Sequence, residues 1–226
     1  AVLSEVTFKV MPAPETVCTL VLPGLSPSQA VDAMTAALQS PFDVSGAAHL
    51  PSAVAADFAT GNNRGNSDSA TVLRLEGPAP SVAARSTSLR ELLSPFGHCA
   101  LLEDTDSQDL WRGVRDVVPF QNGKGLLWRI SAPPSVGLVL AEQMAARFGG
   151  RYFCDWGGGL IWLALDGEAL TEEDASNGGA LALRQALGER GEDMAGHALL
   201  LRAPQDLRRQ VAVFQPQSPE LAKLTA

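Results

Sequence analysis

Two arginines stand three residues apart in the sequence Trp111-Arg-Gly-Val-Arg115. At this spacing both guanidinium groups project from the same face of a helix. Guanidinium groups bind carboxylates through two parallel hydrogen bonds, so the pair is suited to capturing an acid. The alternative is a solvated helix face on which Arg112 and Arg115 accompany Asp109 and Asp116. The residues alone leave both interpretations open.

Three further side chains are candidates for a site in the second half of the chain. Arg129 interrupts the apolar strand sequence of residues 126–130, where it points away from Trp128. It is either a ligand-binding arginine or an edge residue, and we favour the ligand. Asp155 and Trp156 stand immediately before three glycines. A carboxylate there can orient a substrate, although an Asp that stabilises a turn is commoner.

Cysteines and histidines predict neither a nucleophile nor a metal site. The three cysteines have no metal-binding spacing, and each lies in an apolar, strand-like sequence, as is typical of buried free thiols in a reducing compartment: Cys18, Cys99 and Cys154. The three histidines are equally far apart and are predicted to be structural: His49, His98 and His197. The sequence contains no Ser-His-Asp signature, Walker loop or dinucleotide fingerprint.

Residues 151–165 predict a β-hairpin. Aromatic and β-branched residues flank the glycines at 157–159, with no helical segment between them. Glycine tolerates the positive φ that a tight turn needs. A phosphate-binding loop would instead require a helix N-terminus and a following Lys or Ser/Thr. Because Leu-Ile-Trp-Leu follows the glycines, the hairpin is the better interpretation.

The elements around these candidates repeat one order twice. In the first half, strands and helices alternate as βαββαβ over residues 17–22, 27–39, 43–50, 71–75, 80–93 and 98–102. A capping box at Ser26 and Gln29 begins the first helix. The second half repeats the order, offset by roughly 108 residues, over 126–130, the helix after Pro134, the hairpin, 178–187 and 197–202. We therefore predict an α+β fold: two ferredoxin-like units forming an antiparallel sheet with helices on one face.

These elements define the expected domain organisation. Residues 1–16 form a linker strand, and residues 17–226 form one domain with pseudo-repeats at 17–103 and 125–202. A bridging helix is expected at 107–118, and the Gly- and Asn-rich residues 57–69 are expected to form a mobile surface loop. Both ends of the sequence look cut.

Composition limits the classes of partner. The 226 residues carry a formal net charge of −8, whereas nucleic acids and anionic membranes attract basic proteins. No apolar run approaches the roughly 20 residues of a transmembrane helix, and no signal peptide opens the chain. We expect a protein without nucleic-acid partners or transmembrane segments.

Several segments resemble a known family. They lie at residues 1–12, 43–51, 73–77, 126–131, 152–162 and 213–217. Together they are similar to the C-terminal part of the FAD-binding subunit of bacterial glycolate oxidase, one of the vanillyl-alcohol-oxidase-like flavoproteins. The sequence Asp-Trp-Gly-Gly-Gly-Leu-Ile-Trp at residues 155–162 is its most specific part, and the resemblance covers essentially the whole chain.

This resemblance implies a cap or substrate domain that lies over the ring of FAD, while most contacts to FAD belong to a domain outside this sequence. It implies oxidation of glycolate or a related 2-hydroxy acid by hydride transfer to FAD, in a complex with a second flavin subunit and an iron–sulfur subunit. The chain alone is expected to bind no FAD and to be inactive. Its expected location is cytoplasmic, peripheral to the inner membrane through the complex.

The resemblance also suggests roles for individual residues. In relatives, an arginine in a Trp-x-x-x-Arg sequence helps to hold the substrate carboxylate, and this role falls on Arg115. Arg112 and Arg129 are the other substrate-binding candidates, and Asp155 and Trp156 are candidates for facing the cofactor. The zinc-binding histidine pattern of some relatives is not visible, so we expect no metal.

Two alternatives belong to other classes of function. The domain can serve mainly to dock the other subunits of the oxidase complex. It can also be a free-standing ferredoxin-like binder of a small ligand.

Overall fold

The computed structural model describes residues 4–8, 10, 12–58, 68–166, 170, 172–188 and 196–214. In this part of the chain, eight strands form one sheet in which every pairing is antiparallel. The α+β fold is therefore as predicted. The strands are β1 (Thr16–Pro23), β2 (Gly46–Leu50), β3 (Ala70–Gly77), β4 (Ala100–Glu103), β5 (Leu126–Ser131), β6 (Arg151–Asp155), β7 (Leu160–Leu165) and β8 (His197–Arg202).

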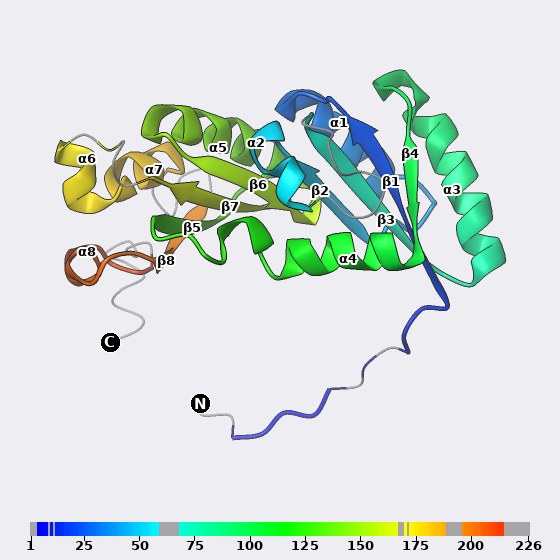
Figure 1. Ribbon diagram of the computed structural model, residues 1–226, viewed down its shortest axis with the longest axis horizontal. Helices are drawn as coiled ribbons and strands as arrows, with labels where there is room; N and C mark the ends of the chain where they lie inside the picture. Colours follow the sequence, from blue (N-terminus) through cyan, green and yellow to red (C-terminus); the bar gives the residue numbers. More distant parts are fainter. Residues whose placement is uncertain are drawn as a thin grey trace.

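Strand order confirms the two ferredoxin-like units. The sheet runs β4-β1-β3-β2-β6-β7-β5-β8, so each half, followed from its outer edge to the centre of the sheet, has its own fourth, first, third and second strand in that order. The first unit carries α1 (Pro27–Leu38) and α3 (Ala79–Leu93), and the second carries α5 (Pro134–Phe148) and α7 (Ala180–Ala186). Because β2 and β6 are neighbours, the two units share one continuous sheet (Figure 1).

The joint between the units is narrow in the sheet and is reinforced by the predicted hairpin. Between β2 and β6 only His49 and Cys154 are register partners. The turn after β6 is a short 3-10 helix, η5 (Trp156–Gly158), which packs against β2 and α1 of the first unit. A Cβ atom added to Gly157 would lie 2.6 Å from Cδ1 of Leu38. The glycine turn is therefore part of the contact between the units.

One face of the sheet is covered by α1, α3, α5 and α7. Alternate strand residues such as Leu20, Leu73, Trp128 and Ile161 point to this face and join the helices in one large apolar core. The predicted capping box begins α1, because the Ser26 side chain accepts from the backbone of Gln29 and the Gln29 side chain accepts from the backbone of Ser26.

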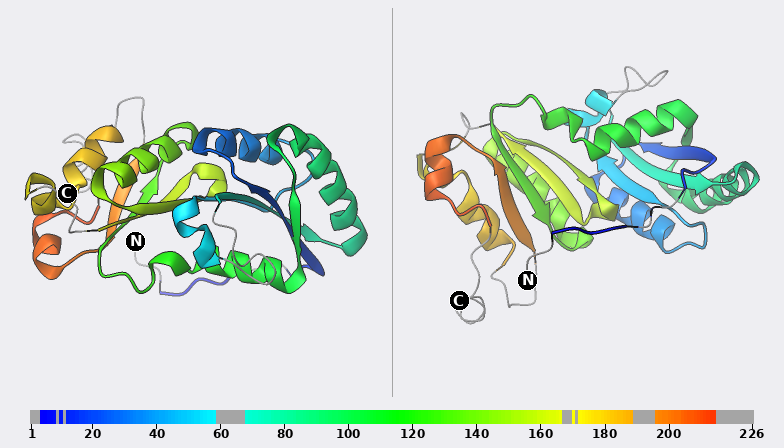
Figure 2. Two further views of the ribbon diagram at one scale, coloured as in Figure 1. Left: turned by 45° about the horizontal axis from the view of Figure 1, so that its top comes forward. Right: turned by 90° about the horizontal axis from the view of Figure 1, so that it is seen from below.

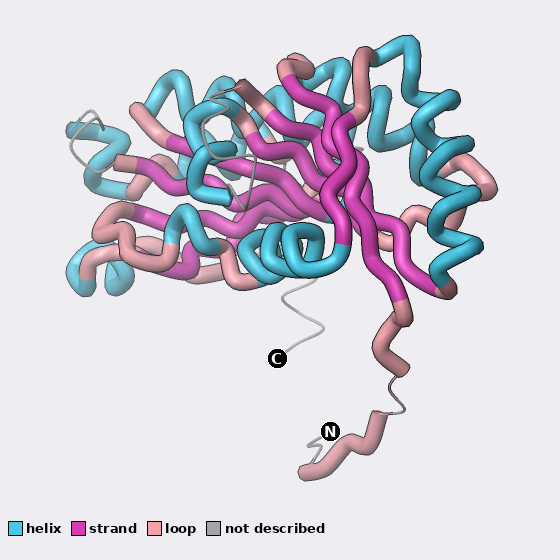
Figure 3. Tube along the Cα trace, turned by 45° about the vertical axis from the view of Figure 1, so that its right-hand side comes forward, coloured by secondary structure: helices cyan, strands magenta, loops and turns pink. Residues whose placement is uncertain are grey.

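Helices also cover part of the opposite face, which the sequence-based prediction left bare. There, α2 (Ser52–Ala55), η1 (Ala56–Phe58), α4 (Asp104–Arg115) and η4 (Val118–Phe120) pack on a second apolar cluster. Figure 1 shows α4 below the sheet and α1 and α5 above it, and Figure 3 shows α4 crossing in front of the strands. The second cluster covers the first unit and β6 and extends to Leu127 on β5 and to Trp162 and Ala164 on β7. Beyond it, no helix of the described ranges covers this face of the second unit (Figure 2).

The bridging helix begins and ends three residues earlier than predicted. It occupies Asp104–Arg115, whereas the prediction was 107–118. Acidic residues in its first turn favour the early start, because they interact well with the positive end of the helix dipole. Val117 has a left-handed backbone with φ of 56°, which stops the helix before Pro119.

Other boundaries differ in smaller ways. The strand expected at 43–50 begins at Gly46, and the one expected at 98–102 begins at Ala100. Helices α6 (Glu172–Asn177) and α8 (Gln205–Gln210) were not predicted. Of the linker strand predicted at 1–16, residues 4–8, 10 and 12–16 are described; apart from Thr16, which begins β1, they form no strand, and the segment runs away from the sheet (Figure 1). Most of the predicted loop at 57–69 lies outside the described residues.

No helix within the described ranges is both long and apolar enough to cross a membrane.

Candidate functional site

A pocket lies on the open face of the sheet, where the two units meet. Its volume is about 970 Å³. The C-terminal half of α4, strands β2 and β3, and the β6–β7 hairpin line it, together with Ala13 and Pro14 before β1. All five residues proposed from the sequence are among its lining: Arg112, Arg115, Arg129, Asp155 and Trp156. The fold brings them together from three separate stretches of chain.

Arg129 and Trp156 form the second-unit end of the pocket. Arg129 lies on β5, and its guanidinium carbon is 5.6 Å from the ring centroid of Trp156, a cation–π contact. On β7, Trp162 is its cross-strand partner, so an indole and the guanidinium lie side by side on the sheet. Within the described ranges no carboxylate pairs with Arg129, and its charge is therefore available to a ligand.

Trp156 has an unusual conformation for a bulky residue. Its φ is 54°, in the left-handed region that costs ordinary residues about 1–2 kcal/mol. The Asp155 carboxylate accepts a hydrogen bond of 2.7 Å from the Trp156 backbone N–H, which holds the turn in place. The indole is left 65% exposed beside the pocket. Strain at an exposed aromatic residue is a feature that clusters at functional sites.

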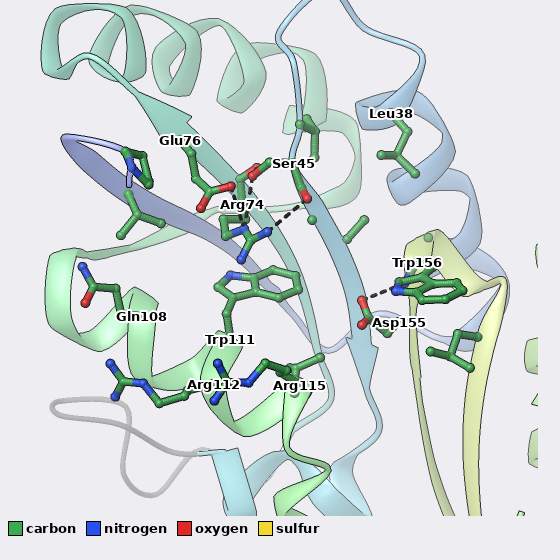
Figure 4. A pocket seen from close by; sticks show the side chains of 18 of the residues that line it. Leu38, Ser45, Arg74, Glu76, Gln108, Trp111, Arg112, Arg115, Asp155 and Trp156 are labelled. Atoms are coloured by element: carbon green, nitrogen blue, oxygen red, sulfur yellow. Dashed lines mark hydrogen bonds and ion pairs between the residues drawn. The ribbon is translucent and has the colours of Figure 1, made fainter. Parts of the chain in front are cut away.

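Asp155 lies between the two ends of the pocket and points toward it (Figure 4). Burial raises the pKa of its carboxyl above the ordinary value, while the hydrogen bond from Trp156 and the charge of Arg74 lower it. The hydrogen bond engages Oδ1. Asp155 therefore stabilises the turn, as one interpretation of the sequence expected, and its role toward a substrate or cofactor stays a prediction.

The two arginines of α4 lie at the rim. Arg112 forms an ion pair with Asp109, and Arg115 binds Asp116 through two hydrogen bonds of 2.7 and 3.0 Å. Their side chains are 54% and 71% exposed. The arginines line the pocket, and each also pairs with an acidic neighbour on a solvated face, as the second interpretation expects; carboxylate binding by the pair stays a prediction.

Arg74 is a pocket residue that the sequence did not single out. It extends from β3, and its guanidinium lies 4.9 Å from the ring centroid of Trp111. Its Nε donates to Ser45 Oγ at 3.1 Å and lies 3.2 Å from Oε2 of Glu76. The available signal was its position between Leu73 and Leu75, the same interruption of an apolar strand that drew attention to Arg129.

Trp111 is fixed at the first-unit end of the pocket. Its indole N–H donates to Thr19 Oγ1 at 2.9 Å, and that hydroxyl shares a 2.7 Å hydrogen bond with Ser107 Oγ. The ring packs against Gly46, where an added Cβ would meet it at 3.0 Å. The indole therefore has a single position, set by a buried hydroxyl pair below and a glycine beside it.

Histidines and cysteines lie away from this pocket. The three cysteines are free and buried, as predicted. His49 is buried and its Nδ1 lies 2.9 Å from Thr71 Oγ1, a structural role as predicted, whereas His98 and His197 are exposed. Burial lowers the pKa of His49 to about 4. Within the described part of the chain, no group of three or more His, Cys, Asp or Glu residues is placed to hold a metal ion.

Comparisons with known proteins give distant structural neighbours. No model of a protein family and no curated protein matches the sequence. Among solved structures, the chain is similar to 4-ethylphenol oxidase from Gulosibacter chungangensis in its isoeugenol complex, with 11% identity and a TM-score of 0.45 over 69% of this chain. It is also similar to an alkyldihydroxyacetonephosphate synthase, with 15% identity and a TM-score of 0.43 over 71% of this chain.

The chain spans about two fifths of the length of these two proteins, covering 40% of the oxidase and 38% of the synthase. At these identities and TM-scores, neither neighbour identifies the function of this chain.

Proposed function

We propose that this chain is the substrate domain of a flavin-linked oxidase, and that its pocket binds a 2-hydroxy acid such as glycolate. One observation carries the proposal. Of the four arginines that line the pocket, Arg129 alone has no carboxylate partner among the described residues. A half-buried guanidinium without a partner attracts a carboxylate, which it binds through two parallel hydrogen bonds. That the oxidase uses a flavin, and that its substrate is a 2-hydroxy acid, are inferred from the family resemblance of the sequence.

Asp155 is positioned to act on the hydroxyl group of such an acid. Asp155 on β6 and Arg129 on β5 flank β7, and neighbouring strands are about 4.8 Å apart. The two backbones are then about 10 Å apart, a gap that the long arginine side chain narrows. An acid held by Arg129 therefore places its hydroxyl toward the Asp155 carboxylate. Because burial raises the pKa of Asp155, its carboxylate accepts the hydroxyl proton more readily.

The pocket lining also fits one face of a flat flavin ring. Trp156 presents an indole that is 65% exposed, and an arginine lies beside it. A flavin bound there would supply the hydride acceptor. The residues of this chain would hold the carboxylate at Arg129, keep the acid in one orientation, and receive the hydroxyl proton at Asp155.

Calorimetric titration of the 226-residue chain with lactate tests the proposal. We expect Arg129→Gln to weaken binding by at least about tenfold, because a charge-assisted hydrogen-bonded pair contributes about 1.5–3 kcal/mol. Arg209→Gln is the matched control, since Arg209 is exposed on α8, away from the pocket. If the Arg129→Gln chain binds lactate as tightly as the unchanged chain does, the proposal is wrong.

A second candidate function is docking of partner subunits through α4. It is favoured by the exposure of Arg112 and Arg115, which lie on the surface and pair with acidic neighbours. The proposed partners are a second flavin subunit and an iron–sulfur subunit. Charge reversal at both arginines separates the two functions. Loss of co-purification with these subunits supports docking, whereas loss of acid oxidation by an intact complex supports substrate binding.

A further inference from the structure

We infer that the pocket selects a 2-hydroxy acid that carries an aromatic group, an inference that rests on the function proposed above. Three of the four tryptophans of the chain line this one pocket. Trp111 comes from α4, Trp156 from the hairpin turn and Trp162 from β7. The fourth, Trp128, belongs to the core on the other face of the sheet. Glycolate has no apolar group to place against these rings.

The polar and aromatic groups follow one another along the pocket in the order that such an acid requires. Arg129 lies at the Trp156 end, and Figure 4 places Asp155 between Trp156 and Trp111. A 2-hydroxy acid carries its carboxylate, its hydroxyl-bearing carbon and its side chain in the same order. With the carboxylate on Arg129 and the hydroxyl toward Asp155, the side chain is directed toward Trp111.

The Trp111 end can receive an apolar group along the edge of the indole. Trp111 is held in one position by its hydrogen bond to Thr19 and is only 8% exposed, so it offers a rigid ring edge, and not an open ring face, at little entropic cost. Val44 and Val114 line the pocket beside it. The guanidinium of Arg74 already lies over the ring and is neutralised by Glu76, so this end presents no unpaired charge.

The volume of the pocket also favours an acid larger than glycolate. Its volume of about 970 Å³ is at the upper end of the range of about 300–1,000 Å³ seen for sites of drug-sized ligands. A two-carbon acid seated on Arg129 and Asp155 would leave the Trp111 end without contact. A phenyl group on the third carbon reaches farther along the pocket and displaces water from apolar surface, which favours binding.

A series of acids tests this inference on the unchanged 226-residue chain. We would titrate glycolate, lactate and 3-phenyllactate into the chain and the Arg129→Gln variant, using calorimetry. We expect 3-phenyllactate to bind at least about tenfold more tightly than glycolate, because burying a phenyl group contributes enough for one to two decades of affinity. We expect both affinities to fall in the Arg129→Gln variant.

The outcomes separate this inference from the proposed function. If glycolate and 3-phenyllactate bind equally well and both depend on Arg129, the aromatic preference is wrong and the proposed function stands. If neither acid binds, or binding does not depend on Arg129, the proposed function fails and the preference fails with it.

Substitutions at Trp111 locate the aromatic group. Trp111→Leu should reduce the affinity for 3-phenyllactate by about tenfold more than the affinity for lactate, whereas Trp111→Phe should retain most of the difference between the two acids. Circular dichroism checks that each variant is folded. If Trp111→Leu does not fold, the series of acids on the unchanged chain still decides the matter. Equal losses for both acids would place the aromatic group elsewhere and overturn the assignment.

Discussion

The guanidinium of Arg129 lies 5.6 Å from the ring centroid of Trp156, although the two residues belong to different strand–turn segments of the second unit. This contact joins the one pocket arginine without a described carboxylate partner to a tryptophan in a strained backbone conformation. A guanidinium that is stacked on a ring still presents its N–H groups in its own plane. The contact therefore orients Arg129 and leaves its N–H groups free for the carboxylate that we propose it binds.

Replacing Trp156 by glycine should weaken ligand binding without lowering the stability of the fold. Glycine adopts a φ of 54° without cost, so Trp156→Gly should raise the free energy of unfolding by about 1 kcal/mol, or leave it unchanged where the lost ring contacts offset this gain. Binding of 3-phenyllactate should weaken, because Arg129 loses the ring that orients it. Urea unfolding and calorimetry measure the two quantities. A loss of stability above about 1 kcal/mol would show that the indole has a structural role instead.

Much of the fold follows from local patterns in the sequence. The hairpin at residues 151–165 and the capping box at Ser26 were predictable because their signals lie within a few consecutive residues. The twofold βαββαβ order then fixed each unit as ferredoxin-like, since few arrangements of these elements are possible. Joining the units through β2 and β6 was not predictable, because it rests on one register pair and on the packing of a turn.

The candidate site was predictable only in part. Arg129 stood out because a charge interrupted an apolar strand, and Asp155 stood out beside the glycines. Arg74 carries the same signal as Arg129, but its contact with Trp111 joins residues 37 positions apart and depends on where α4 packs. The bounds of α4 were wrong at the sequence level because Pro119 seemed to end the helix, whereas the left-handed backbone of Val117 ends it earlier.

Asp155→Asn should stabilise the protein at neutral pH. The folded-state pKa of Asp155 is raised by burial, so its contribution to stability is present at low pH and is lost as pH rises through that pKa. Asparagine keeps an oxygen for the Trp156 N–H and carries no charge to desolvate. Urea unfolding should therefore show a gain for the variant at pH 7 and a smaller one at pH 3. The exposed Asp206→Asn is the control, and equal gains at both pH values would contradict the prediction.

His49 should make the protein less stable in mild acid. Its folded-state pKa of about 4 lies below the ordinary value of 6.5, because the ring is buried against Thr71 and beside Cys154. Between these values the unfolded chain takes up a proton that the folded chain does not. The free energy of unfolding should therefore fall by up to about 3 kcal/mol as the pH drops from 6.5 to 4, and be insensitive to this group above 6.5.

Urea unfolding at pH 7, 5.5 and 4.5 measures this fall. His49→Gln should flatten the pH dependence, since an amide does not titrate in this range. His98→Gln is the matched control, because His98 is exposed and should leave the dependence as it is. If both variants lose stability in acid as the unchanged chain does, another group is responsible.

The glycine turn offers a matched pair of substitutions for the joint between the units. Gly157 has a φ of +65°, and an added Cβ would lie 2.6 Å from Leu38 Cδ1 on α1. Gly159 has a φ of −79°, and the nearest atom to an added Cβ lies at 3.4 Å, an ordinary contact. Gly157→Ala should therefore lower the free energy of unfolding by about 1–3 kcal/mol, whereas Gly159→Ala should change it by less than about 1 kcal/mol.

The same pair tests whether this turn positions the pocket. Gly157 follows Trp156 directly, and Leu38 also lines the pocket, so a shift at this contact moves the pocket wall as well as the joint. Affinity for 3-phenyllactate should fall in Gly157→Ala and be retained in Gly159→Ala, with unfolding measured on the same samples. If the two variants are equally stable and bind equally well, the close approach between the turn and α1 is not what holds the two units together at the pocket.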